Sequence, residues 1–332
     1  MSAAAICCVC LLTAWGFFAL WYQLPGGRML RRCGVVVWTL FNLAVVVGVL
    51  RGHPGVAFPM FALAFVLLVA WWRGIRPSNE RTWSDDVARM ATGVVAGNQV
   101  TLDNVRHFDW RTRTDYTQHW ETRTFDLGSL GSIDMLLSYW SMAAIAHVLI
   151  SFGFDDGQHV VFSVEIRREK TESFSEVGGF FKEFELSIIA CDERDVIRLR
   201  TNVRNEDVYL YRIRMPADNM RSLFLAYVAE ANKLARAPRF YNTITVNCTT
   251  LVYQMMQRIV GRLPLDIRLL FSGYLPGYVY KVGGLDVRHS LAELRALGRI
   301  TERAKQSDRR PTFSADIRAG IPPLEPLAKV WP

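Results

Sequence analysis

The residue best placed for covalent chemistry is Cys248, which stands where a polar run gives way to a periodic apolar segment. Residues 251–260 repeat apolar side chains at helical spacing and predict an amphipathic helix. Asn247 or Thr245 is suited to be its N-cap, so Cys248 is expected in the first turn. The helix dipole and free backbone N–H groups lower a thiol pKa there and can hold an oxyanion. The position therefore predicts a nucleophilic thiolate.

A thiol nucleophile needs a base within hydrogen-bond reach, and His147 is the histidine whose surroundings differ from the rest. It lies in the apolar run 146–152, which predicts a β-strand. An imidazole at the rim of such a strand is either a satisfied core histidine or a functional one. Its pairing with a single thiol at a helix start favours the functional interpretation. The other five histidines, in polar stretches or between membrane segments, are His53, His107, His119, His159 and His289.

A third group must orient the base, and the sequence after His147 offers one. The runs 145–154 and 159–167 flank an Asp-Asp-Gly-Gln turn and predict a β-hairpin. In the second strand Ser163, Glu165 and Arg167 share one face. Either Glu165 or Ser163 could accept the imidazole N–H, and we favour Glu165. The alternative is that Glu165 pairs with a neighbouring arginine on a solvated face.

Four further residues are candidates for substrate or oxyanion contacts. Tyr241, Asn242 and Asn247 flank the thiol and could position it or donate to an oxyanion, although ordinary loop chemistry explains them equally well. Arg198 alternates with Arg200 on a predicted strand and could meet a phosphate headgroup, or it could be paired within the protein.

Composition excludes several classes of function. No P-loop, G-x-G-x-x-G, G-x-S-x-G or H-E-x-x-H pattern occurs, and no His, Cys, Asp or Glu cluster has metal-ligand spacing. We therefore expect no metal and no cofactor. Only Cys191 and Cys248 lie outside apolar membrane stretches, and they could form one disulfide. The net charge of +8 favours anionic lipid surfaces over nucleic acid, for which no binding motif is present.

The chain of 332 residues is 51% hydrophobic, and the excess lies in the first 72 residues. The apolar stretches 3–23, 33–50 and 55–72 are each about long enough to cross a membrane. They predict a three-helix anchor over residues 1–76. Arg28, Arg31 and Arg32 follow the first stretch, and the positive-inside rule assigns them, and with them everything after the third helix, to the cytoplasm.

The remaining chain predicts an α+β domain in which an antiparallel sheet packs on helices. Strands are expected within 97–126, in the hairpin, and at 194–202 and 207–214, while 180–190 suits helix or strand. Helices are expected at 216–235 and after Cys248. We predict a linker at 77–96, a domain at 97–275 and a basic, Pro-rich extension at 276–332.

Five motifs follow one another in the second part of the chain. They are Asn-Val-Arg-His-Phe-Asp at 104–109, the run 146–152, Phe-Ser-Val-Glu-Ile-Arg-Arg-Glu at 162–169, Asp-Glu-Arg-Asp at 192–195 and the run 241–250. In this order they resemble the Lnb N-terminal periplasmic domain family, and the resemblance covers about residues 97–275. The family is similar to permuted papain-like (NlpC/P60-type) thiol enzymes, in which histidine precedes cysteine, as His147 precedes Cys248. In contrast to better-known members, the membrane segments of this chain precede the domain.

The resemblance implies an acyltransferase of the bacterial cell envelope. Such an enzyme moves an acyl chain from a phospholipid to the N-terminal amine of a lipoprotein, or to a peptide acceptor. Cys248 would carry the acyl group as a thioester, His147 would serve as base and then acid, and Glu165 would orient His147. The enzyme would be a multi-pass protein of the inner membrane with its domain facing the periplasm.

Two other functions remain open at this point. The same site could hydrolyse peptidoglycan peptides or lipid esters, because a thioester can pass its acyl group to water as well as to an amine. Alternatively, the chain could be a membrane-anchored binding protein without catalysis. The last hypothesis predicts that Cys248 and His147 lie beyond hydrogen-bond reach of roughly 3–4 Å.

Overall fold

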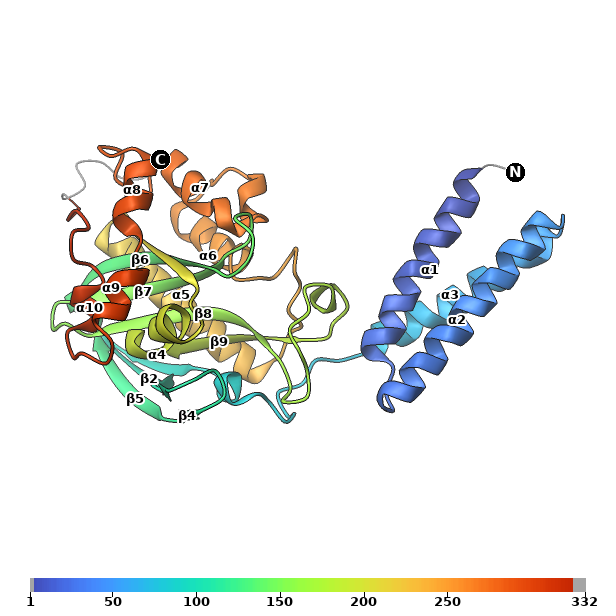
Figure 1. Cartoon of the computed structure of the whole chain (residues 1–332), viewed down its shortest axis with the longest axis horizontal. Coiled ribbons are helices and arrows are strands. Elements are labelled where there is room, and N and C mark those ends of the chain that lie inside the picture. The colour runs from blue at the N-terminus through green and yellow to red at the C-terminus, as the bar shows by residue number, and fades with distance from the viewer. Residues whose placement is uncertain (1–2, 325–332) are drawn as a thin grey trace. The chain divides into compact units, whose positions relative to one another are not determined.

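The structure, a computed structural model, describes residues 3–324 and divides into two compact units (Figure 1). The first unit contains the residues up to Glu80 together with Glu172–Glu185 and Phe240–Thr243. The second contains Arg81–Thr171, Leu186–Arg239 and the residues from Ile244 onward. Each unit is described separately below.

Three helices form most of the first unit, and each is long and apolar enough to cross a membrane. They are α1 (Ala3–Gln23), α2 (Gly27–Leu50) and α3 (Pro54–Gly74). Helix α2 begins before the predicted start at residue 33, so the arginines of the first loop lie on its first turns. Pro59 lies inside α3 without interrupting it. It is close to the helix start, where a missing N–H removes a single backbone hydrogen bond.

Polar side chains link α1 to α2. The hydroxyl of Thr13 donates to Asn42 Oδ1 at 3.0 Å, and the Asn42 amide donates to the Trp38 carbonyl at 2.7 Å. The Trp38 indole N–H donates to the Thr13 carbonyl at 3.0 Å. Because hydrocarbon offers no other partner to these groups, the three residues fix the register of the two helices.

The segment Glu172–Glu185 packs on the ends of α1 and α3. Gln23 Nε2 donates to the carbonyl of Lys182 at 2.7 Å, and Lys182 Nζ donates to the carbonyl of Trp72 at 2.8 Å. The Phe181 ring lies against Tyr22 and Trp72. These contacts bring the C-terminal ends of α1 and α3 to the same segment. The arginines that begin α2 therefore lie at the end of the bundle from which the chain leaves α3.

The second unit contains a sheet of eight strands in the order β1-β2-β9-β8-β7-β6-β10, with β5 also paired to β2 (Figure 1). The strand pairs whose register is defined are antiparallel, except for the short parallel pair of β2 and β9. The sequence pattern did not indicate this parallel pair. The strands are β1 (Thr92–Ala96), β2 (Gln99–Arg106), β5 (Trp120–Asp126), β6 (Leu130–Tyr139), β7 (His147–Phe154), β8 (His159–Arg167), β9 (Glu185–Cys191) and β10 (Asp207–Arg212), beside a separate pair of β3 (Asp109–Trp110) and β4 (Tyr116–Thr117).

Helices cover the sheet. On one side α5 (Ala217–Arg236) packs across β1, β6 and α6 (Thr250–Val260). Phe224 of α5 meets Phe152 and Phe162 edge-on, and Tyr227 stacks on Phe162 with ring centroids 4.8 Å apart. A second core joins α4 (Glu193–Arg198) to the sheet. Its buried residues are Leu136, Leu149, Val161, Ile189, Cys191, Val196, Ile197, Val208, Leu210, Ile300, Ala304, Phe313 and Ile317.

The region 276–332, predicted as an extension, contributes to this second core through residue 317. Ile300, Ala304, Phe313 and Ile317 are fully buried there. They come from α9 (Thr301–Gln306), α10 (Phe313–Asp316) and adjacent turns, which follow α7 (Leu275–Lys281) and α8 (Leu291–Gly298). Basic side chains outnumber apolar ones within residues 299–310, and the spacing of Ile300 and Ala304 among them did not reveal their burial.

The prediction of a strand at 194–202 is wrong. These residues form α4 and a turn of π-helix, Leu199–Val203. Asp192 caps α4 by accepting the backbone N–H of Arg194 at 2.8 Å. The capping aspartate and the acidic first turn are helix-start signals, and they override the strand propensity of the valine and isoleucine that follow.

The Asp192–Asp195 cluster, one of the motifs of the family resemblance, is largely internal. Asp195 is fully buried and accepts hydrogen bonds from the Arg106 guanidinium at 2.8 and 2.9 Å, and from the Trp110 indole at 2.7 Å. Glu193 is also fully buried and meets Arg318 at 2.6 Å. Arg318 contacts Asp134 at 2.8 Å as well, so one guanidinium from the C-terminal region neutralises two interior carboxylates.

We predict that Arg318→Ala lowers the free energy of unfolding by about 3–5 kcal/mol, because it leaves two buried carboxylates without a cation. Thermal and denaturant unfolding of the detergent-solubilised chain measures this. Arg299→Ala is the matched control, because Arg299 pairs with Asp207 at an exposed position and its loss should cost less than about 1 kcal/mol. Equal effects of the two substitutions would contradict an interior role for Arg318.

Candidate active site

The hairpin of β7 and β8 positions a histidine beside a carboxylate, as the sequence predicted. Its antiparallel register places Leu149 opposite Ser163, so the first residue of β7 lies near the last residues of β8. His147 Nε2 is 3.0 Å from Glu165 Oε1 and 2.7 Å from Ser163 Oγ. The Ser163 hydroxyl donates to Glu165 Oε1 at 2.7 Å. The two alternatives for the orienting group therefore both hold, with Ser163 bridging the imidazole and the carboxylate.

The carboxylate of Glu165 has a second cationic neighbour, the guanidinium of Arg200. Arg200, on the π-helical turn after α4, has a nitrogen 3.6 Å from Glu165 Oε1 and donates to Glu206 at 3.0 Å. Glu206 in turn accepts the hydroxyl of Ser138. Burial opposes the charged form of Glu165, but the His147 imidazole, Arg200 and Ser163 outweigh it and hold the pKa of Glu165 well below its usual range. Glu165 is therefore ionised at neutral pH.

The thiol lies in the turn that leads into α6. Helix α6 begins at Thr250, and Asn247 Oδ1 accepts the backbone N–H groups of Thr249 at 2.9 Å and Thr250 at 2.8 Å. Asn247 thus serves as the cap that the sequence predicted. Cys248 lies two residues before α6 begins at Thr250, and not in the first turn as predicted, between the capping side chain and the helix. The cap fixes the turn that presents the sulfur.

Cys248 and His147 lie close enough for each group to shift the pKa of the other. Burial raises the pKa of the Cys248 thiol, but the hydrogen bond and positive charge of His147, with the Val148 backbone N–H and the Thr249 hydroxyl, lower it below its usual value. Burial lowers the pKa of His147, whereas the Glu165 carboxylate and the thiol together raise it to about 9. Because Nε2 faces Ser163 and Glu165, Nδ1 is the ring nitrogen left for the sulfur. The lowered pKa of the thiol and the raised pKa of the imidazole favour a thiolate–imidazolium pair.

The same turn offers a free donor. Within residues 3–324 the backbone N–H of Cys248 donates no hydrogen bond, whereas those of Thr249 and Thr250 are taken by Asn247. The Cys248 N–H lies beside the sulfur at the positive end of α6. An oxygen of a group attacked by the thiolate would come close to this donor.

An apolar cavity begins beside the pair. Val148 and Thr249, the residues that follow His147 and Cys248, both line it. The rest of the lining comes from β6, β7, α5, α6, α7 and the intervening segments, and its exposed surface is entirely apolar. The other lining residues are Ile133, Met135, Ile150, Ile213, Met215, Leu223, Val252, Tyr253, Met256, Leu263, Leu269, Leu275, Tyr278, Val279 and Val282.

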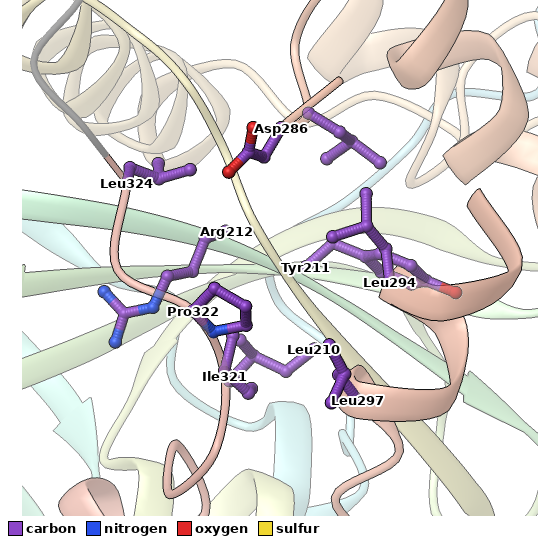
Figure 2. Close-up of a pocket in the computed structure, with 10 residues that line it drawn as sticks. Leu210, Tyr211, Arg212, Asp286, Leu294, Leu297, Ile321, Pro322 and Leu324 are labelled. Atoms are coloured by element: carbon purple, nitrogen blue, oxygen red, sulfur yellow. The ribbon is translucent and has the colours of Figure 1, made fainter. Parts of the chain in front are cut away.

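A second, smaller cavity lies elsewhere in the unit (Figure 2). Figure 2 shows Leu210 and Arg212 of β10, Leu294 and Leu297 of α8, and Ile321 around it. None of the residues of the Cys248 site lines this cavity. We therefore assign it no part in thiol chemistry.

Of the predicted contact residues, Arg198 has partners elsewhere in the second unit, and Tyr241 and Asn242 belong to the first unit. Arg198 belongs to α4, where its guanidinium donates to Asp308 at 2.6 Å and to the Trp110 carbonyl at 2.5 Å. The side chain is 8% exposed, so the prediction of a headgroup contact is wrong. Tyr241 and Asn242 belong to the first unit, where the Tyr241 N–H donates to the Phe184 carbonyl. Their contribution to an oxyanion site stays a prediction.

Sequence reasoning missed the support that Arg200 gives to Glu165, because it placed Arg200 on a strand. It also missed the Val148 N–H and the apolar cavity. The acidic helix-start signal at Asp192 could have revealed the first, whereas the other two depend on chain segments that meet only in the fold. Cys191 and Cys248 are both free thiols. Among the described residues no group of three or more His, Cys, Asp or Glu side chains could hold a metal ion.

We predict that alkylation of Cys248 stays fast below pH 9.0, the ordinary pKa of a thiol, because the folded pKa is lowered. His147→Ala removes the imidazole that lowers this pKa most, while burial continues to raise it and only Val148 and Thr249 still lower it, so the alkylation midpoint should move to higher pH. At pH 7 the rate should fall roughly tenfold or more, since each pKa unit is a tenfold change in thiolate.

Site-resolved mass spectrometry of iodoacetamide adducts across pH measures this rate. Cys191 is an internal control, because burial raises the pKa of its thiol and it should stay unlabelled. Superimposable profiles for the wild type and His147→Ala would show that the imidazole does not set the state of the thiol.

The chain was compared with known proteins, solved structures and family models. No curated protein and no solved structure matches the chain. A family model does match residues 116–273, a range that includes His147, Glu165 and Cys248. That model describes the Lnb N-terminal periplasmic domain, and the match supports the family to which the sequence motifs pointed.

Proposed function

We propose that the chain is a membrane-anchored thiol acyltransferase. It takes an acyl chain from a phospholipid as a Cys248 thioester and passes it to an amine, the N-terminus of a lipoprotein or a related peptide. The observation that carries the proposal is the position of the Cys248–His147 pair at the start of a wholly apolar cavity. A thiolate beside such a cavity suits an ester whose carbonyl meets the sulfur while its hydrocarbon chain leaves water.

The first half-reaction forms the thioester. The Cys248 thiolate attacks the ester carbonyl carbon, and the oxygen that gains charge accepts the backbone N–H of Cys248. As the carbon–oxygen bond breaks, the His147 imidazolium protonates the departing alkoxide, which leaves as a lysophospholipid. A carbon–sulfur bond replaces the carbon–oxygen bond, and His147 becomes neutral.

The second half-reaction transfers the acyl group. Neutral His147 accepts a proton from the attacking amine, a carbon–nitrogen bond forms, and the carbon–sulfur bond breaks to regenerate the thiolate. Throughout, Glu165 stays ionised and holds the Nε2–H, so Nδ1 remains turned to the sulfur. Arg200 and Ser163 position Glu165 and do not touch the reacting atoms.

We also propose that the unit is a permuted papain-like (NlpC/P60-type) domain. A thiol before a helix, paired with a histidine on an antiparallel strand that precedes it in the chain, is the arrangement that this hypothesis requires. The order His147, Glu165, Cys248 is consistent with it. A solved structure of a relative would test the topology strand by strand.

The domain's side of the membrane follows from its substrate. Lipoprotein N-acylation takes place outside the cytoplasm, so we propose an inner-membrane protein whose domain faces the periplasm. The arginines that begin α2 lie at the same end of the bundle as the exit from α3, and the positive-inside rule alone would place them in the cytoplasm. The segment Glu172–Glu185 makes hydrogen bonds to the ends of α1 and α3, and the positive-inside rule does not take such contacts into account.

We predict that Cys248→Ser abolishes the acyl adduct. The full chain in vesicles of phosphatidylethanolamine and phosphatidylglycerol should show an acyl thioester by intact-mass spectrometry, and the variant should lose at least about a thousandfold in turnover. His147→Ala should lose about 10²–10⁴-fold. Cys33→Ser, in α2, is the matched control and should keep wild-type activity. Acylation that survives Cys248→Ser would exclude the proposed nucleophile.

The acceptor is decided by adding a diacylglyceryl-cysteine peptide to the acylated enzyme. The proposal predicts an N-acylated peptide. Free fatty acid as the sole product, with or without the peptide, would identify the enzyme as a hydrolase of the same site.

We predict that an alkaline phosphatase fused after the last residue is active in intact cells, because that reporter folds only outside the cytoplasm, whereas a cytoplasmic reporter at the same position is silent. The opposite pattern would exclude the lipoprotein reaction, since the acceptor would then be on the other side of the membrane.

A further inference from the structure

Seven large apolar side chains lie exposed on one part of the second unit. We call them the apolar rim. Two come from the connection between β6 and β7, and five come from the segment between α6 and α7. They are Trp140, Met142, Leu265, Ile267, Leu270, Phe271 and Tyr274.

Hydrogen bonds join the two parts of the rim. The Ser272 hydroxyl accepts the backbone N–H of Ala146 at 2.9 Å and donates to the Ala146 carbonyl at 2.6 Å. The backbone N–H of Gly273 donates to the Ala144 carbonyl at 3.0 Å. A Cβ on Gly273 would lie 2.0 Å from the Ala143 carbonyl oxygen, so this close approach requires glycine. The connection that carries the rim leads directly into His147.

The rim is the outer surface of the cavity wall. Leu263, Leu269 and Leu275 are buried and line the apolar cavity. They alternate with Leu265, Ile267 and Leu270, which are exposed. The same short segment therefore turns leucines inward to the cavity and apolar side chains outward to its surroundings.

The charges around the rim are of one sign or are paired. Arg258, Arg262 and Lys281 are exposed beside it. Asp266, within the rim segment, is held by Arg268 at 2.6 Å, which keeps the pKa of that carboxyl well below its usual range and its charge compensated. An apolar surface with Trp and Tyr and a cationic border matches the interface of an anionic bilayer. The three membrane helices of the same chain hold the unit near such a surface.

We propose that the apolar rim inserts into the lipid interface and is the place where an acyl chain passes from the bilayer into the cavity beside Cys248. This inference rests on the proposed function for the identity of the transferred chain. The insertion itself rests on the exposed side chains and their cationic border. A patch of this kind on a unit tethered to the membrane would otherwise remain in water.

Photo-crosslinking tests the insertion. Benzoylphenylalanine replaces Leu265 or Phe271 in the full chain, which is reconstituted in vesicles of phosphatidylethanolamine and phosphatidylglycerol. Both positions should crosslink to lipid acyl chains, as detected by mass spectrometry. Val287, exposed and apolar but outside the rim, is the matched position and should not. Absence of lipid adducts at both rim positions, or equal adducts at Val287, would overturn the proposal.

Acyl-donor dependence tests the role of the rim in delivery. Leu265→Asp with Ile267→Asp changes side chains that are 85% and 62% exposed, so the fold should tolerate them. Acylation of Cys248 from vesicle phospholipid should fall at least tenfold, whereas acylation by a water-soluble short-chain acyl ester should stay within about twofold of wild type. Val287→Asp should change neither rate.

Undiminished acylation from vesicles in the double variant, or an equal loss with the soluble ester, would overturn the delivery role. Failure of both donors to acylate the wild-type chain would instead refute the proposed function, and the crosslinks would still decide whether the rim enters the membrane.

Discussion

The carboxylate of Glu165 lies between two cations, the imidazole of His147 and the guanidinium of Arg200, and the site depends on this arrangement. A carboxylate in the interior is stable only when it is paired and hydrogen-bonded, so Glu165 fixes both partners. Its hold on Nε2 turns the other nitrogen of the ring to Cys248. The charge of Glu165 also keeps the imidazolium favourable, and the imidazolium keeps the thiolate favourable. The ionisation of the Cys248 thiol therefore depends on Glu165, which acts through the imidazole of His147.

The pair lies on the boundary between a polar and an apolar environment. Neighbouring residues of a strand face opposite ways, so His147 turns to the carboxylate while Val148 lines the cavity. Cys248 and Thr249 divide in the same way at the start of α6. In both segments, one residue belongs to the charged pair and the next residue lines a space suited to hydrocarbon. This arrangement lets a carbonyl meet the thiolate while its chain remains out of water.

Two different features relate the protein to the membrane. The three apolar helices provide a permanent anchor, with Thr13 and Asn42 linking the first two of them. The apolar rim offers a reversible contact, because its side chains are attached to the wall of the cavity rather than to a spanning helix. An anchor raises the local concentration of lipid, whereas a contact of this kind decides which part of the lipid meets the site. In the proposed reaction the two features would act at separate steps.

The sequence by itself determined the membrane helices, the β7–β8 hairpin, the helix after Cys248 and the candidate trio, because each depends on local periodicity, turn chemistry or capping. It could not determine the environment of Arg198 or Arg200, since residues 194–202 carry strand-forming side chains behind a helix cap. Nor could it show that Ile300 and Phe313 are core residues, or that the apolar cavity exists. Those features arise where segments distant in the chain meet, and burial and charge pairing across such contacts are decided only by the tertiary structure.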